Sequence, residues 1–114
     1  MFTLYGIKNC NTVKNARTWL EQHDISYQFH DVRADGLTQE QLQNFAERVD
    51  WNSLINRTST SWRKLSPEQQ ADLTEHKAIQ LIVNAPTLLK RPVLDTGELL
   101  LVGFKEQNYQ DKLL

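Results

Sequence analysis

The pattern of apolar and polar residues predicts a strand, a helix and a second strand in the first third of the chain. Residues 2–7 are apolar and rich in strand-forming side chains, and residues 11–23 carry apolar side chains at helical spacing. Residues 25–32 alternate between apolar and polar side chains, as a strand does. This order predicts two parallel strands joined by a right-handed crossover.

The rest of the chain is predicted to hold further helices and a closing hairpin. Thr38 can cap a helix together with Gln41, and Ser66–Pro67–Glu68 is typical of another helix start. The predicted elements are a turn at 34–36, helices from 38, at 52–55, from 66, at about 75–84 and from 105, and a hairpin of strands 92–94 and 99–102. We expect one α/β domain over residues 1–114, with a four-stranded mixed sheet, flanking helices and a helical insertion at about 38–85.

Composition narrows the class of protein. The chain has 114 residues, of which 39% are hydrophobic, and a formal charge of −1, which gives no support for nucleic-acid binding through bulk charge. No apolar run reaches transmembrane length and the N-terminus lacks a signal-peptide pattern, so we expect no membrane association. One cysteine cannot form an internal disulfide, which favours the reducing cytoplasm. Three scattered histidines and a single cysteine predict no metal site.

The basic residues are unevenly distributed. Three stretches, 1–20, 51–67 and 76–94, contain no Asp or Glu, yet they hold nine of the thirteen Lys and Arg residues. If the fold brings these stretches together, they would form a positively charged cleft that attracts an anion. The alternative is an ordinary scatter of surface charge. The nine residues are Lys8, Lys14, Arg17, Arg57, Arg63, Lys64, Lys77, Lys90 and Arg91.

The single cysteine, Cys10, lies where the first strand is expected to lead into the first helix. The unpaired N–H groups of a first helical turn and the positive end of the helix dipole both favour a thiolate over a thiol. A thiolate attacks disulfides and oxyanion centres, so this placement indicates chemistry. The alternative is that Cys10 is only a small buried apolar residue.

The residues after Cys10 are candidates for anion binding. We expect the backbone N–H groups of Asn11, Thr12 and Val13 to hold an anion or the thiolate, and Lys14 to add positive charge. Lys14 and Arg17 are equally compatible with a solvated surface, and Asn11 or Thr12 with a simple helix cap.

Several motifs together resemble the ArsC (arsenate reductase)-like family, and within it the YffB branch, which is related to the Spx/MgsR regulators. The motifs are Tyr5–Ala16, which contains Lys-Asn-Cys-Asn-Thr-Val-Lys, Arg33–Leu37, Trp62–Leu65, Lys90–Pro92 and Val102–Phe104. The resemblance covers nearly the whole chain. It implies a thioredoxin-like fold in which Cys10 is the nucleophile and Pro92 is a cis-proline opposite it.

The resemblance also implies arginines around the nucleophile. Arg91 matches one oxyanion-binding arginine of the arsenate reductases, and Arg57, one residue out of register, is the candidate for a second. The sequence leaves open whether Arg57 or Arg63 faces the cleft. A third arginine is expected after the last strand, where this chain has Val102–Gly103–Phe104. This departure argues against arsenate reduction.

Two functions follow from the resemblance. The first is a monothiol thiol reductase that acts on a small thiol or disulfide substrate, with no tightly bound cofactor and with glutathione as co-substrate, because the chain has no second cysteine to resolve a mixed disulfide. The second is a non-enzymatic, Spx-like regulatory or protein-interaction module that contacts RNA polymerase. Many Spx regulators carry a Cys-x-x-Cys switch, but Val13 occupies the second cysteine position here, so that switch cannot form.

Overall fold

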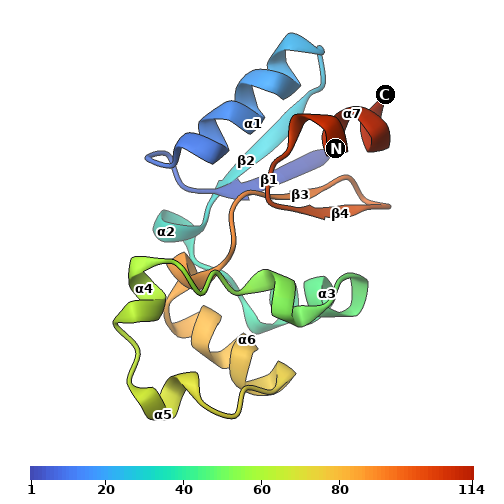
Figure 1. The fold of residues 1–114 in the computed structure, drawn as a ribbon. Coiled ribbons are helices and arrows are strands. Elements are labelled where there is room, and N and C mark those ends of the chain that lie inside the picture. The colour runs from blue at the N-terminus through green and yellow to red at the C-terminus, as the bar shows by residue number, and fades with distance from the viewer. The chain divides into compact units, whose positions relative to one another are not determined.

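Four strands form one mixed sheet in the order β2-β1-β3-β4 (Figure 1). β1 is parallel to β2 and antiparallel to β3, and β3 is antiparallel to β4. The computed structural model, which describes residues 1–114, therefore confirms the predicted four-stranded mixed sheet. The strands are β1 Phe2–Gly6, β2 Tyr27–Asp31, β3 Val93–Asp95 and β4 Leu100–Val102.

Two helices pack with this sheet around one apolar core. Leu4 of β1, Leu20 of α1 (Asn11–Gln22) and Tyr109 of α7 (Glu106–Leu113) are all fully buried. Leu113 of α7 is partly buried against the same core. The buried members of this cluster are Leu4, Ala16, Trp19, Leu20, Leu94, Leu101 and Tyr109.

β2 is shorter at both ends than the strand predicted at 25–32. Val32 belongs to α2 (Val32–Asp35), and the end of α1 explains why β2 begins late. The N–H of Ile25 donates to the carbonyl of Leu20 at 2.9 Å, and the N–H of Asp24 donates to that of Glu21 at 3.2 Å. With Asp24 at a positive φ of 56°, these bonds make a Schellman cap. The cap uses Ile25, so β2 begins only at Tyr27.

The segment between β2 and β3 is helical. Its elements are α2 Val32–Asp35, α3 Gln39–Arg48, the 3₁₀ helix η1 Trp51–Leu54, α4 Thr60–Arg63, α5 Pro67–Gln70, α6 Glu75–Asn84 and the 3₁₀ helix η2 Pro86–Leu88. The predicted capping box of Thr38 and Gln41 is present, and Ser66 forms a second one with Gln69.

One expectation for this segment was wrong, and one of its helices was not predicted. Residues 34–35 belong to α2, and only Gly36, at a positive φ of 68°, makes the turn predicted at 34–36. Helix α4 was not predicted, because it is only one turn long and has no buried residue to give a periodic signal. Its cap is Ser59, whose side chain accepts a hydrogen bond from the N–H of Trp62.

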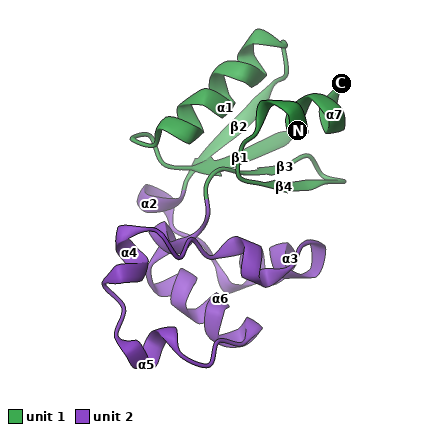
Figure 2. Ribbon diagram, viewed as in Figure 1, with its two compact units in different colours: residues 1–31, 91–114 green, residues 32–90 purple.

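The chain divides into two compact units (Figure 2). We call residues 1–31 and 91–114 the sheet unit, and residues 32–90 the helical unit. The helical unit has buried residues of its own, including Leu42 and Phe45 on α3 and Ile82 on α6. The bounds of 38–85 expected for the insertion fall inside this unit.

Candidate active site

Cys10 caps the N-terminus of α1. Its backbone is extended (φ −120°, ψ 120°), and its carbonyl accepts the first helical hydrogen bond, from the N–H of Lys14 at 2.9 Å. The Cys10 side chain makes no capping hydrogen bond and is partly exposed, and the first turn contains no acidic residue. The sulfur therefore lies at the end of the helix where N–H groups and the helix dipole favour a negative charge.

A close contact between β1 and α1 fixes the start of this helix. Gly6 ends β1, and a Cβ built on it would lie 2.9 Å from both γ-methyl groups of Val13. Val13 is fully buried, so its side chain contributes to packing and only its backbone N–H could bind an anion. Sequence reasoning missed the role of Gly6, because the partner that excludes a Cβ comes from the next element of the chain.

The residues along the first turn are open to solvent. Asn11, Thr12 and Lys14 are all exposed, in contrast to the buried Val13 between them. A ligand that approaches Cys10 can therefore contact these residues.

Strand pairing brings Arg91 and Pro92 to the same end of the sheet as Cys10. Tyr5 of β1 pairs with Val93 of β3 in an antiparallel register, so the residues before Val93 lie beside the end of β1 that leads toward Cys10. The Arg91–Pro92 peptide bond is cis, and the carbonyl of Pro92 accepts a hydrogen bond from the N–H of Gly103 at 2.7 Å. Pro92 is buried and Arg91 is half-buried.

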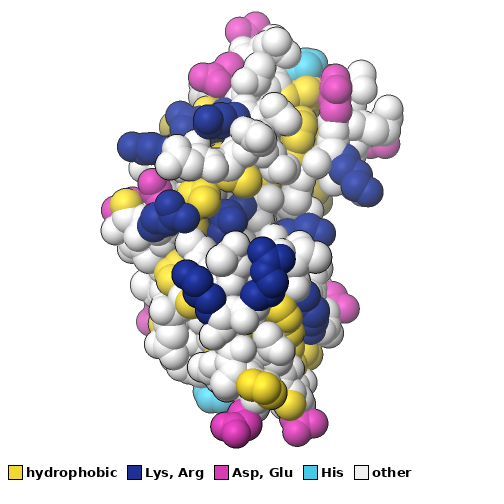
Figure 3. All heavy atoms as spheres, turned by 60° about the vertical axis from the view of Figure 1, so that its left-hand side comes forward, with side chains coloured by type: hydrophobic (Ala, Val, Ile, Leu, Met, Phe, Trp, Pro, Cys, Tyr) yellow, Lys and Arg dark blue, Asp and Glu magenta, His cyan; other side chains and the backbone are white.

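The other two candidate arginines belong to the helical unit, where local hydrogen bonds hold them. Arg57 is exposed, its Nη2 donates to Oδ1 of Asn52 at 3.0 Å, and its Cζ lies 5.5 Å from the centre of the Trp62 ring. Arg63 donates through Nη1 to the carbonyl of Thr58 at 3.3 Å. Exposed Lys and Arg side chains, drawn dark blue, are visible in Figure 3.

The segment where a third arginine was sought serves the fold instead. Gly103 has a positive φ of 79°, which suits glycine in the turn after β4. The ring of Phe104 packs edge-on against Tyr109, with ring centres 4.7 Å apart. These residues hold α7 against the core and supply no charge.

The chain shows neither a metal-binding cluster nor a helix that could span a membrane. No three side chains of His, Cys, Asp or Glu gather closely enough to hold a metal ion. None of the helices is both long enough and apolar enough to cross a membrane.

Comparisons with known proteins agree with the motifs. Residues 5–112 match the ArsC family. An uncharacterized protein of Haemophilus influenzae is 41% identical over 110 residues, which are 96% of each chain. A solved structure of a YffB protein is 46% identical, with a TM-score of 0.96 over 100% of both chains. The global transcriptional regulator Spx of Listeria innocua is 29% identical over 93% of this chain and 82% of its own.

Proposed function

The chain belongs to the ArsC family, with its thioredoxin-like fold, and we propose that it is a monothiol, glutathione-dependent thiol–disulfide oxidoreductase. The observation that carries the proposal is the position of Cys10, the only cysteine, at the N-terminus of α1, at the same end of the sheet as Arg91 and Pro92. A thiolate held at a helix N-terminus is the reactive form in thiol–disulfide exchange.

The proposed reaction has two exchanges. The Cys10 thiolate attacks one sulfur of a substrate disulfide, a Cys10–substrate disulfide forms, and the second sulfur leaves as a thiolate that takes a proton from water. The thiolate of reduced glutathione then attacks the substrate sulfur of this mixed disulfide, which releases Cys10 as a thiolate. The net result converts one disulfide and one glutathione into one thiol and one glutathione–substrate disulfide. An external thiol is needed because the chain has no second cysteine.

The residues around Cys10 have separate parts in this reaction. The first-turn N–H groups of Asn11, Thr12 and Val13 would stabilise the Cys10 thiolate as it forms and leaves. The Arg91 guanidinium would add a positive charge at the same end of the sheet. Pro92 would lie next to an extended substrate at this end of the sheet.

Arsenate reduction fits this site less well than disulfide exchange. A tetrahedral oxyanion needs several charged donors, and the segment after β4 supplies a turn and a core aromatic ring instead. Loss of one charged, bidentate donor typically costs about a hundredfold or more in rate. A disulfide carries no such charge and does not require those arginines.

The test is the reaction of the purified chain with oxidised glutathione, followed by intact mass. We expect one glutathionyl adduct at Cys10, reversal by reduced glutathione, and no adduct on Cys10→Ser. The chain in urea at the same pH is the matched control, because it carries the same single thiol without the helix. Equal rates for the folded and the unfolded chain would remove the argument from the position of Cys10.

A second candidate is an Spx-like regulatory module, which the similarity to Spx over 93% of this chain favours. In that case Cys10 would be dispensable, and binding to the RNA polymerase α subunit would be the activity to measure. A folded chain whose Cys10 reacts with iodoacetamide but accepts no glutathione would support this candidate. Unchanged polymerase binding by Cys10→Ser would support it further.

A further inference from the structure

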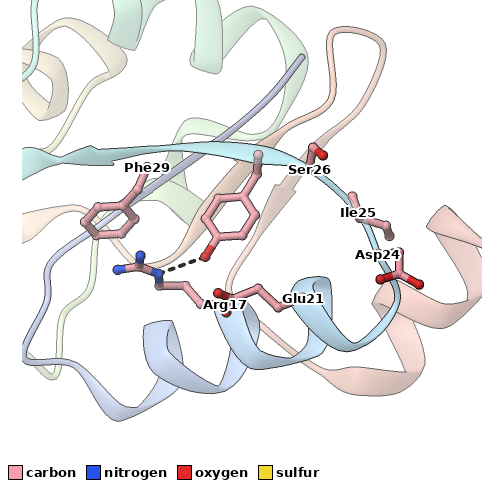
Figure 4. Close-up of a pocket in the computed structure, with 7 residues that line it drawn as sticks. Arg17, Glu21, Asp24, Ile25, Ser26 and Phe29 are labelled. Atoms are coloured by element: carbon pink, nitrogen blue, oxygen red, sulfur yellow. Dashed lines mark hydrogen bonds between the residues drawn. The ribbon is translucent and has the colours of Figure 1, made fainter.

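A groove of about 600 Å³ runs between α1 and β2 in the sheet unit. Arg17, Glu21 and Asp24 line it from α1 and the turn that follows, and Tyr27 and Phe29 line it from β2. Figure 4 shows Arg17 beneath Phe29 at one end and Asp24 at the other. The volume is typical of ligand-binding pockets.

Arg17 is fixed in this groove by two aromatic side chains. Its Nε donates to the hydroxyl of Tyr27 at 2.9 Å, and its Cζ lies 4.3 Å from the centre of the Phe29 ring. The hydrogen bond and the cation–π contact together set the plane of the guanidinium. A ligand that binds Arg17 therefore does not have to order a flexible side chain first.

The terminal nitrogens of Arg17 remain available for binding. The hydrogen bond to Tyr27 uses only Nε, and neither terminal nitrogen makes a hydrogen bond or an ion pair with another side chain. Glu21 lies four residues further along α1, where a pair with Arg17 would support the helix, but Arg17 turns to the aromatic rings instead. A planar guanidinium with both terminal nitrogens open suits a carboxylate, which it can bind through two parallel hydrogen bonds.

β2 adds a second binding element. β2 is an edge strand, because β1 pairs with one of its sides and no strand pairs with the other. An edge strand offers backbone N–H and C=O groups to an extended peptide, which can join the sheet as a further strand. Side chains of such a peptide that lie on the same face of the sheet as α1 would enter the groove.

The charges along the groove define which peptide it suits. Arg17 is the cation near Phe29, and Glu21 and Asp24 are exposed carboxylates toward the start of β2. A complementary peptide carries an acidic side chain opposite Arg17 and a basic side chain opposite the two carboxylates. Since alternate residues of a strand share a face, these two side chains are two or four residues apart.

We propose that this groove is a docking site for an extended segment of a partner protein, whose carboxylate binds the terminal nitrogens of Arg17 while its backbone pairs with the edge of β2. Arg17 lies roughly 10 Å along α1 from Cys10, at 1.5 Å per residue. The proposal therefore stands or falls separately from the chemistry of Cys10.

The test is an NMR titration of the ¹⁵N-labelled chain with a blocked eight-residue peptide, acetyl-Thr-Lys-Val-Thr-Val-Glu-Val-Thr-amide. Its Lys and Glu are four residues apart on one face. We expect shifts of the Arg17 Nε–H signal and of the Tyr27–Phe29 amides. A matched peptide with Gln in place of Glu should bind about tenfold more weakly, because it loses one charge-assisted pair.

Variants of the chain separate this site from general attraction. Arg17→Gln should weaken binding about tenfold, whereas Lys112→Gln, the same change of charge on α7, should leave it unchanged. Tyr27→Phe keeps the ring but removes the acceptor that holds Nε, so it should weaken binding by less than Arg17→Gln. Unchanged dispersion of the remaining signals in each variant shows that the chain is folded.

Three results would overturn the proposal. The first is an absence of shifts at Tyr27–Phe29 at millimolar peptide. The second is equal affinity for the Glu and Gln peptides, or an equal effect of Arg17→Gln and Lys112→Gln. The third is an equal affinity for free glutamate, which would show that the groove binds small carboxylates without strand pairing.

Discussion

Gly6→Ala is the substitution for which the structure predicts the clearest energetic effect. The added Cβ would lie 2.9 Å from both γ-methyl groups of Val13, closer than real Cβ contacts allow. Overpacking of this kind costs about 1–3 kcal/mol. Because Ala has less conformational freedom than Gly in the unfolded chain, the substitution also stabilises the folded state by about 0.4–1 kcal/mol. We expect a net loss of between about 0 and about 2.6 kcal/mol in the free energy of unfolding.

The companion substitution Val13→Ala tests the cause of this loss. Without its γ-methyl groups, residue 13 presents only its Cβ, 3.5 Å from the new methyl group, which is an ordinary contact. Gly6→Ala should then be neutral or stabilise the chain by up to about 1 kcal/mol in the Val13→Ala background. The two substitutions should therefore couple by about 1–3 kcal/mol.

Urea unfolding of the wild type, the two single variants and the double variant measures this coupling. The midpoints should shift while the slope stays constant, which shows that the extent of unfolding is unchanged. The reasoning fails if Gly6→Ala has the same effect in both backgrounds. It also fails if Gly6→Ala clearly stabilises the wild-type chain.

Three further predictions follow from single residues. Tyr109→Phe should leave the free energy of unfolding in urea unchanged or raise it, by up to about 1–3 kcal/mol. The reason is that the buried Tyr109 hydroxyl has no hydrogen-bond partner, while the ring contacts remain in the variant. A clear loss of stability would show that the hydroxyl has a partner. Burial raises the pKa of Tyr109, so above pH about 10 the folded chain keeps a proton that the unfolded chain loses. The free energy of unfolding should therefore fall more steeply with rising pH in the wild type than in Tyr109→Phe, by about 1.4 kcal/mol per pH unit. The same pH dependence of stability in both proteins would contradict this. Arg91→Ala should slow the reaction of Cys10 with oxidised glutathione by up to about tenfold at little cost in stability, and Arg91→Lys should recover part of the rate. A lower melting temperature with an unchanged rate of reaction of Cys10 would show that Arg91 serves the stability of the fold instead.

Local signals in the sequence predicted helix starts well. The capping box of Thr38 and Gln41 forms as expected, and Ser66 opens the helix that begins at Pro67. These signals work because a cap joins groups that are three residues apart, so the sequence contains both partners side by side. Strand limits were less predictable, since the Schellman cap of α1 removed Ile25 from β2.

The candidate site was predictable in part. The strand-to-helix pattern placed Cys10 at the start of α1, and the family resemblance drew attention to Arg91 and Pro92. The role of Arg17 was not predictable, because its sequence context fitted a solvated surface as well as an anion site. Its aromatic neighbours, Tyr27 and Phe29, are ten and twelve residues away and meet it only after the crossover folds.

The sequence by itself determined the order of the strands and longer helices, the presence of a single thiol and several helix starts, because each depends on periodicity or on residues a few positions apart. The tertiary structure decided which distant residues become neighbours, because strand pairing and helix packing join segments that are far apart in the sequence. The register of β1 with β3 places Arg91 and Pro92 at the end of the sheet that leads to Cys10. The packing of α1 on β1 and beside β2 demands glycine at position 6 and builds the groove around Arg17, because these contacts join elements that only the folded chain makes neighbours.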